Sequence, residues 1–310
     1  MKRIIALILV AFMTVLSVSS CGKRETEANI SFEIQDNLAD VSGKKATVIL
    51  LGGQSNASGC SMDQFLKSNV EPEKYDEYSA GYDNVYINYY VTDRNVSNGF
   101  VKCANMQGEL GGYFGPELGL AQGLHEAYPD RTFFIIKCAW GGTNLCEQWR
   151  SPTGRGNTGI LYANFTAFVN ASLEYLTSKG YDVSLEAMCW MQGESDSVNK
   201  SNAEKYEKNL SRFIADIREE FASYAAPDGI AFIDAYIAEN HAYWVHFDIV
   251  NEAKRRVASS SEMNAVVDTV SEGLTCSGEP TDAPDLAHYD SLSELKLGHL
   301  FAAKVIEYLD

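Results

Sequence analysis

Short apolar segments alternate with longer amphipathic segments along most of this chain, and this alternation limits the folds that it can adopt. Most of the short segments are apolar at nearly every position, which is typical of strands buried on both faces of a parallel sheet. We predict five such strands, at residues 47–51, 132–137, 185–190, 230–234 and 265–268. A chain of 310 residues that is 45% hydrophobic can bury a substantial core around them.

The segments that separate these strands carry helical patterns. We predict helices at residues 116–128, 161–176, 202–221, 248–258 and about 292–309. In the third of these, apolar side chains from Tyr206 to Phe221 recur on one face. Because strand and helix alternate throughout, we predict one α/β domain over residues 46–310, a three-layer α/β/α sandwich with a five-stranded parallel sheet.

The first residues resemble an export signal. Met1–Arg3 is basic and is followed by an apolar run from Ile4 to about Val18, the order found in signal peptides. The sequence Val-Ser-Ser-Cys that ends at Cys21 resembles the lipobox of bacterial lipoproteins. We therefore predict a lipoprotein signal peptide at residues 1–20 and a lipidated Cys21, which would anchor an exported protein at a bacterial cell surface or in the periplasm. The alternative is an ordinary signal peptide that is cleaved nearby, with Cys21 as a spare thiol.

The polar residues 21–45 carry no clear helical period and are predicted to form a tether. A second unusual segment lies at about 61–112, where tyrosines are frequent. We interpret it as an insertion in the domain, with one strand near 85–91 and aromatic rings that can stack on sugars or join the core.

Charge and cysteine usage exclude several functions. The chain has 42 acidic and 25 basic residues, so a nucleic-acid partner is not expected. The five histidines are scattered and no Cys-x-x-Cys occurs, so we predict no metal site and no cofactor. Export permits disulfides, and Cys60 and Cys103 lie in loop-like sequence where they can pair. Cys138 and Cys189 lie in apolar runs and are expected to be buried thiols.

Polar residues suited to catalysis follow four of the predicted strands. Their loops are Gly52–Asn56, Gly141–Asn144, Gln192–Asp196 and, before the last helix, Asp285–Tyr289. Ligands of parallel sheets bind beyond the carboxyl ends of the strands. We therefore expect these loops to meet at one edge of the sheet.

The residues in these loops suit acyl transfer. A serine becomes a nucleophile when an imidazole takes its proton and a carboxylate fixes the imidazole tautomer. Ser55, His288 and Asp285 supply these three groups, although Ser55 alone would be ordinary turn chemistry. The oxyanion that forms needs preorganised hydrogen-bond donors. The candidate donors are the Ser55 amide, the amides of Gly141 and Gly142, and the Gln192 carboxamide.

Several neighbouring residues are candidates for supporting roles. Glu194 can orient the Ser55 loop, contact His288 or satisfy backbone donors, and we expect it to support the site together with Gln54 and Asn56. Weaker candidates for substrate contacts are Thr143, Asn144, Trp149 and Trp244.

Four sequence blocks resemble a known family. The blocks GGQSN, KCAWGGTNL, WMQGESD and DLAHYDSLSELKLG are similar to those of the SGNH hydrolases, in particular carbohydrate esterase family 6 and the sialate O-acetylesterase-like proteins. The resemblance spans about 47–309 and implies an SGNH/flavodoxin-like fold. It also implies a catalytic triad of Ser55, His288 and Asp285, with Gly141 and Gln192 in the oxyanion hole. Gly53 and Gln192 depart from the general SGNH blocks but agree with the carbohydrate-esterase branch.

The resemblance implies a carbohydrate acetylesterase whose substrate is an acetylated glycan. Acetylated xylan or a related plant polysaccharide is the first expectation. O-acetylated sialic acid is the main alternative, and cell-wall glycans are another. An alternative of a different class is a surface glycan-binding lipoprotein that has kept the fold without the chemistry.

Overall fold

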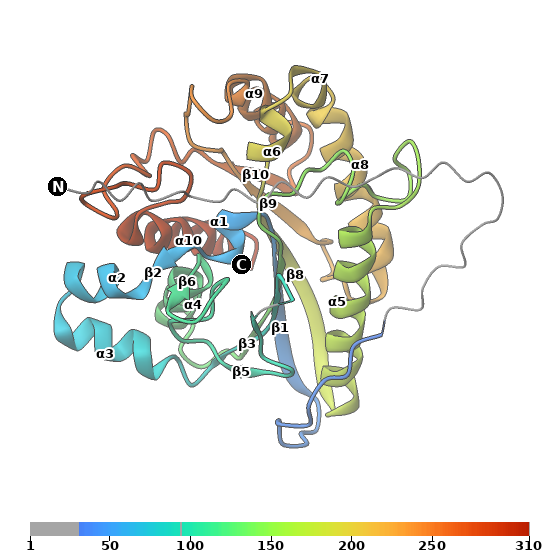
Figure 1. Cartoon of the computed structure of the whole chain (residues 1–310). Coiled ribbons are helices and arrows are strands. Elements are labelled where there is room, and N and C mark those ends of the chain that lie inside the picture. The colour runs from blue at the N-terminus through green and yellow to red at the C-terminus, as the bar shows by residue number, and fades with distance from the viewer. Residues whose placement is uncertain (1–30, 94, 310) are drawn as a thin grey trace.

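A mostly parallel sheet forms the centre of the molecule, and helices cover both of its faces (Figure 1). The structure is a computed structural model, and it describes residues 31–93 and 95–309. The predicted signal peptide, the predicted lipidation site at Cys21 and the start of the predicted tether lie outside the described residues. In the described ranges, no helix is both long and apolar enough to cross a membrane.

All five predicted strands are present and lie parallel in one sheet. They are β1 (Lys44–Gly53), β7 (Phe133–Ala139), β8 (Tyr181–Met191), β9 (Ala231–Ala235) and β10 (Asn264–Val267). The strand order is β10-β9-β8-β1-β7-β3-β4, which places the first strand of the chain at the centre. The predicted three-layer α/β fold is confirmed.

The sheet is larger than the predicted five strands. It has eight, because β3 (Val85–Val91) pairs in parallel with β7, and β4 (Asn95–Val96) and β5 (Val101–Lys102) pair antiparallel with β3. The tyrosine-rich segment therefore extends the sheet. Its ends meet where β2 (Ser61–Met62) pairs with β6 (Tyr113–Phe114). The strand β3 mixes polar and aromatic residues and so lacks the continuous apolar pattern of the central strands.

The predicted helices are also present. On one face lie α4 (Glu117–Ala127) and α10 (Ser291–Ile306), and on the other lie α5 (Ile160–Ser178) and α8 (Tyr206–Glu220) (Figure 1). The helix α9 (Phe247–Ala258) packs against α8. The third predicted helix begins late, because α7 (Lys200–Ala203) forms a separate turn before α8. The remaining short helices are α1 (Ser55–Ser58), α2 (Asp63–Asn69), α3 (Pro72–Ala80), α6 (Glu194–Ser197) and the 3-10 turn Ala222–Tyr224.

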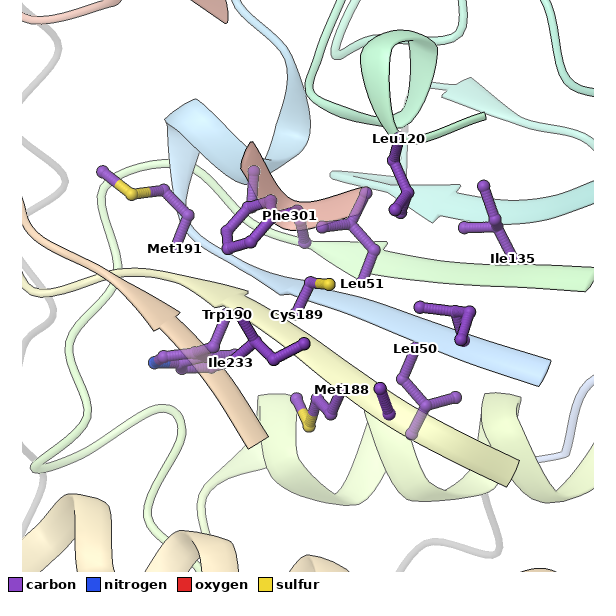
Figure 2. Packing of buried hydrophobic residues seen from close by; sticks show 14 of the residues in the cluster. Leu50, Leu51, Leu120, Ile135, Met188, Cys189, Trp190, Met191, Ile233 and Phe301 are labelled. Atoms are coloured by element: carbon purple, nitrogen blue, oxygen red, sulfur yellow. The ribbon is translucent and has the colours of Figure 1, made fainter. Parts of the chain in front are cut away.

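The core lies on both faces of the central strands. Figure 2 shows Leu51 of β1 close to Phe301 of α10, whereas Leu50 points toward the opposite face. Both leucines are fully buried. Because each face of β1 meets a layer of helices, successive side chains are apolar, which accounts for the continuous apolar run in the sequence.

Two glycines allow α4 and α10 to approach closely. A Cβ on Gly298 would lie 2.2 Å from the carbonyl oxygen of Pro116, and one on Gly119 would lie 2.1 Å from that of Leu295. The two helices are thus in backbone contact at this crossing. Since α10 directly follows the loop that carries His288, this contact helps to fix that loop.

The segment before β1 packs against the domain. The Phe32 ring contacts the rings of Tyr90 and Phe168, and Lys179 forms ion pairs with Asp36 and Asp40 at 2.8 and 2.5 Å. The prediction of a tether up to residue 45 is therefore wrong for the described part of this segment. The apolar residue Phe32 and the two acidic residues find partners on strands and helices that are distant in sequence.

The cysteines of the described residues are all free thiols. Cys103 is buried, and its thiol lies 3.6 Å from the Glu117 carbonyl oxygen, so the predicted pairing with Cys60 is not formed. Cys138 and Cys189 are buried, as predicted.

We predict that Gly298→Ala destabilises the protein by about 1–3 kcal/mol, because the added methyl group must push α10 away from α4. Urea unfolding followed by circular dichroism measures this. The control is Gly111→Ala, since a Cβ at Gly111 meets nothing within 4 Å. Equal stability of the two variants would contradict a tight helix contact.

Candidate active site

The loops after β1, β7 and β8 begin at the same level of the sheet. Gly53 is in register with Ala139 on one side and with Met191 on the other. The Gln54 amide donates to the Met191 carbonyl at 2.9 Å, and the Trp140 amide donates to the Gly53 carbonyl at 3.0 Å. The ladder thus continues past the strand ends and places the Ser55 loop between the two others.

Ser55 follows a sharp turn at the end of β1. Gly53 has a φ of 139°, and a Cβ there would lie 2.0 Å from the Met191 carbonyl oxygen, so this position requires glycine. Ser55 is the first residue of α1 and is 9% exposed. The turn holds Ser55 at the edge of the sheet, with its Cβ 3.6 Å from the position of a Gly141 Cβ.

His288 and Asp285 form the predicted pair. The His288 Nδ1 lies 2.7 Å from the Asp285 Oδ2, and the Asp285 Oδ1 accepts a hydrogen bond from the Ala287 amide at 3.0 Å. One tight loop therefore orients both side chains, as the three-residue spacing predicted. Asp285 holds Nδ1 and leaves Nε2 for another partner.

Two hydrogen bonds join the His288 loop to the segment that carries Ser55. The Tyr289 amide donates to the Asn56 Oδ1 at 3.2 Å, and the Tyr289 carbonyl accepts from the Ser61 hydroxyl at 2.6 Å. Asn56 also donates from Nδ2 to the Glu194 Oε1 at 2.8 Å. The expected supporting roles of Asn56 and Glu194 fit this geometry. In the described residues no hydrogen bond joins the Ser55 hydroxyl to His288 itself, which is common before substrate binds.

Nearby charges set the protonation of the site. Burial favours the neutral imidazole, but the hydrogen bond to Asp285 and the charges of Asp285, Glu194 and Glu109 outweigh it, so the pKa of His288 is raised above 6.5. The hydrogen bond to His288 lowers the pKa of Asp285 below 3.8. Burial raises the pKa of Glu194 above 4.5.

Backbone amides next to Ser55 are free to bind an oxyanion. In the described part of the chain, the amides of Ser55, Gly141 and Gly142 make no hydrogen bond. A Cβ on Gly141 would lie 3.6 Å from the Ser55 Cβ, so the two loops are adjacent here. Gly142 has a φ of 71°, and a Cβ there would meet nothing within 4 Å. The role of these amides as oxyanion donors stays a prediction.

The prediction that Gln192 donates to an oxyanion is wrong. Gln192 is 0% exposed, and its Nε2 donates to the Thr143 carbonyl, the Asp196 Oδ2 and the Gln54 Oε1 at 3.1, 2.7 and 3.3 Å. The Gln54 Oε1 also accepts from the amides of Gly193 and Ser195, each at 3.3 Å. Both carboxamides connect loops because burial obliges them to find partners within the protein.

The predicted substrate contact of Trp149 is also wrong, and two other predicted contact residues are nearly buried and bond to neighbouring loops. Trp149 is 0% exposed, and its Nε1 donates to the Thr143 hydroxyl at 2.8 Å. Thr143 in turn donates to the Trp140 carbonyl at 2.6 Å. Trp244 is buried and donates to the Ala238 carbonyl at 2.8 Å. These side chains hold loops together. Asn144 is half-buried, and its contact with substrate stays a prediction.

Sequence reasoning missed Glu109. Its carboxylate lies beside Gly141, with Oε2 3.1 Å from the position of a Gly141 Cβ. Glu109 belongs to the tyrosine-rich segment, far from the four loops in sequence. No spacing pattern links it to Ser55, because the segment returns to the site through the β2–β6 pair.

A family model described as "Carbohydrate esterase, sialic acid-specific acetylesterase" matches residues 45–307 of the chain. This range contains all four loops of the site. No curated protein matches the chain significantly.

Similar solved structures share this fold. One is a protein from Arabidopsis thaliana with 20% identity and a TM-score of 0.60, in which the match covers 84% of this chain and 98% of the other. NanS has 14% identity and a TM-score of 0.62, with 87% and 99% covered. A carbohydrate acetylesterase from Xanthomonas citri has 16% identity and a TM-score of 0.54, and the match covers 85% of this chain and 57% of that longer protein.

We predict that Asn56→Ala lowers the free energy of unfolding by about 1–3 kcal/mol, because it leaves the buried Glu194 carboxylate and the Tyr289 amide without a partner. The matched control is Asn170→Ala, which removes a solvent-exposed bond of the same type to Glu220. We expect a change within about 0.5 kcal/mol for the control. Similar losses in both variants, measured by urea unfolding, would contradict the bridging role.

Proposed function

The chain belongs to the family of carbohydrate esterases described as sialic acid-specific acetylesterases and is a carbohydrate acetylesterase, and we propose that it cleaves its ester through an acetyl-Ser55 intermediate. The observation that carries this proposal is the connection of the His288–Asp285 pair to the Ser55 segment through Tyr289. It joins the loop of the proposed base to the segment of the proposed nucleophile, which supports a shared site.

In the first step the Ser55 hydroxyl oxygen attacks the acetyl carbonyl carbon, and its proton passes to the Nε2 of His288. The bond between the carbonyl carbon and the sugar oxygen then breaks. His288 returns the proton to that oxygen, and the sugar leaves with a free hydroxyl group. In the second step water attacks the acetyl carbonyl carbon and gives a proton to the Nε2 of His288; the bond between that carbon and the Ser55 oxygen breaks, His288 returns the proton to Ser55, and acetate is released.

Asp285 and the free amides support both steps. Asp285 holds the imidazole tautomer that leaves Nε2 unprotonated, and its charge stabilises the imidazolium that forms. We propose that the amides of Ser55, Gly141 and Gly142 donate to the oxyanion, which is supported by their lack of other hydrogen bonds in the described residues and by the closeness of Gly141 to Ser55. Each such donor is worth about 3 kcal/mol of transition-state stabilisation by analogy with other hydrolases.

For the substrate we propose acetylated xylan or a related plant polysaccharide. The second candidate is O-acetylated sialic acid, which the family description supports. Hydrolysis of acetylated xylan, acetylated mucin glycans and small aryl acetates separates them. Deacetylation of mucin glycans without activity on xylan would overturn the first choice.

We also propose that the protein is exported and lipid-anchored at Cys21 at a bacterial cell surface or in the periplasm. The basic and apolar leader before Cys21 supports this. Metabolic labelling with a palmitate analogue tests it, because label that persists in Cys21→Ala would contradict anchoring at this residue.

We predict that Ser55→Ala abolishes hydrolysis of aryl acetates while the far-ultraviolet circular dichroism stays unchanged, because the acetyl group then has no acceptor. Ser211→Ala, which alters an exposed hydroxyl on α8, is the control and retains full activity. Activity that survives in Ser55→Ala would contradict the proposed mechanism.

The raised pKa of His288 predicts the pH dependence. The imidazole acts as a base only when neutral, so kcat/KM is expected to rise with pH through a pKa above 6.5. Asp285→Asn removes the hydrogen-bonding carboxylate that raises this pKa. We expect the remaining activity of that variant to show a lower pKa and a smaller plateau. An unchanged pKa would contradict the pairing.

A further inference from the structure

Glu109 places a carboxylate at the edge of the proposed acyl site, although the ester-cleaving steps do not use it. Its Oε2 lies 3.1 Å from the point that a Gly141 Cβ would occupy, and the Ser55 Cβ lies 3.6 Å from the same point. The carboxylate and the nucleophile therefore flank Gly141, whose amide is a proposed oxyanion donor. A substrate whose acetyl group reaches Ser55 must pass close to this charge.

The backbone around Glu109 is held in place. The Glu109 amide donates to the Gly59 carbonyl at 2.9 Å, directly after the helix α1 that begins at Ser55. The preceding Gly108 donates to the Tyr113 carbonyl at 2.8 Å and accepts from the Asn95 side chain at 2.7 Å. The position of the carboxylate is thus tied to the same turn that positions the nucleophile.

The charge of Glu109 is not neutralised by a neighbour. Within residues 31–93 and 95–309, no Lys, Arg or His side chain forms an ion pair with Glu109, and the one hydrogen-bond partner of its carboxylate is the Cys60 thiol at 3.3 Å. A thiol is a weak donor, so most of the acceptor capacity of the carboxylate stays available. Burial, together with the negative charge of Glu109, raises the pKa of Cys60, which remains neutral.

Buried cations near the sheet have other partners. Lys137 pairs with Glu117 and Lys254 with Asp234, each at 2.6 Å. Glu109 adds to the charges of Asp285 and Glu194 that act on the imidazole. Three carboxylates therefore act on the imidazole of the proposed acyl site.

We propose that Glu109 is a substrate-recognition residue, which accepts hydrogen bonds from sugar hydroxyls beside the acetyl group and makes the site prefer neutral acetylated sugars to sugars with a carboxylate near the ester. The inference rests on the proposed function. Carboxylates form strong hydrogen bonds with hydroxyl donors. Two carboxylates in a partly buried site repel each other, because the local dielectric constant is lower than that of water. Neutral acetylated glycans thus fit this site better than sialic acids, which are anionic.

The test compares two substrates that differ in one group, a methyl glucoside and the methyl glucuronoside acetylated at the same hydroxyl. We expect the wild type to prefer the glucoside by about tenfold or more in kcat/KM. Glu109→Gln keeps the shape and removes the charge, so the preference should fall toward parity. The control is Glu219→Gln, which removes an exposed charge near the end of α8, before the amino end of β9, and should keep the wild-type preference.

Two further measurements keep the inference testable if Glu109→Gln folds poorly or is inactive. In the wild type, added salt should weaken the preference for the glucoside, because it screens the repulsion. If Glu109→Gln is active, the acidic limb of its pH–rate profile for aryl acetate hydrolysis should move to lower pH, because one charge that raises the pKa of His288 is gone.

Equal rates of the wild type on the two sugars, or a preference that neither salt nor an active Glu109→Gln variant changes, would overturn the inference. Failure of the proposed function is a separate result, because it would appear as aryl acetate hydrolysis that persists in Ser55→Ala.

Discussion

The side chain of Asn56 makes the contact on which the rest of the site depends, because it joins three loops from distant parts of the chain. It donates to Glu194 in the loop after β8 and accepts from the Tyr289 amide, 233 residues away. Both bonds are buried, so water does not compete for them. Strand register brings the first two loops together, and the packing of α10 on α4 brings the third within reach.

The negative charge around His288 has three consequences for the proposed chemistry. It raises the pKa of the imidazole, which makes His288 a stronger base. The neutral form that acts as the base then predominates only at higher pH. It also stabilises the imidazolium that forms when Ser55 loses its proton. The same field repels an anionic substrate, so proton transfer and substrate choice depend on one set of carboxylates.

Much of the fold and part of the site were predictable from local patterns. The central strands were predictable because burial on both faces leaves a continuous apolar run, and the His288–Asp285 pair because a three-residue spacing fits one tight loop. The roles of Gln192 and Trp149 were predicted wrongly. A polar or aromatic side chain in a loop of the site has the same appearance in the sequence whether it faces substrate or a neighbouring loop, and both residues face neighbouring loops.

The sequence by itself determined the family, the alternation of strand and helix, and the residues able to carry acyl transfer, since each depends on residue type and short spacing. Only the tertiary structure decided which of those residues lie close together in the folded protein. It joined the β3 strand to the sheet, packed Phe32 and the segment up to β1 against the domain, and brought Glu109 beside Gly141. These outcomes depend on contacts between residues far apart in the chain, which leave no local pattern in the sequence.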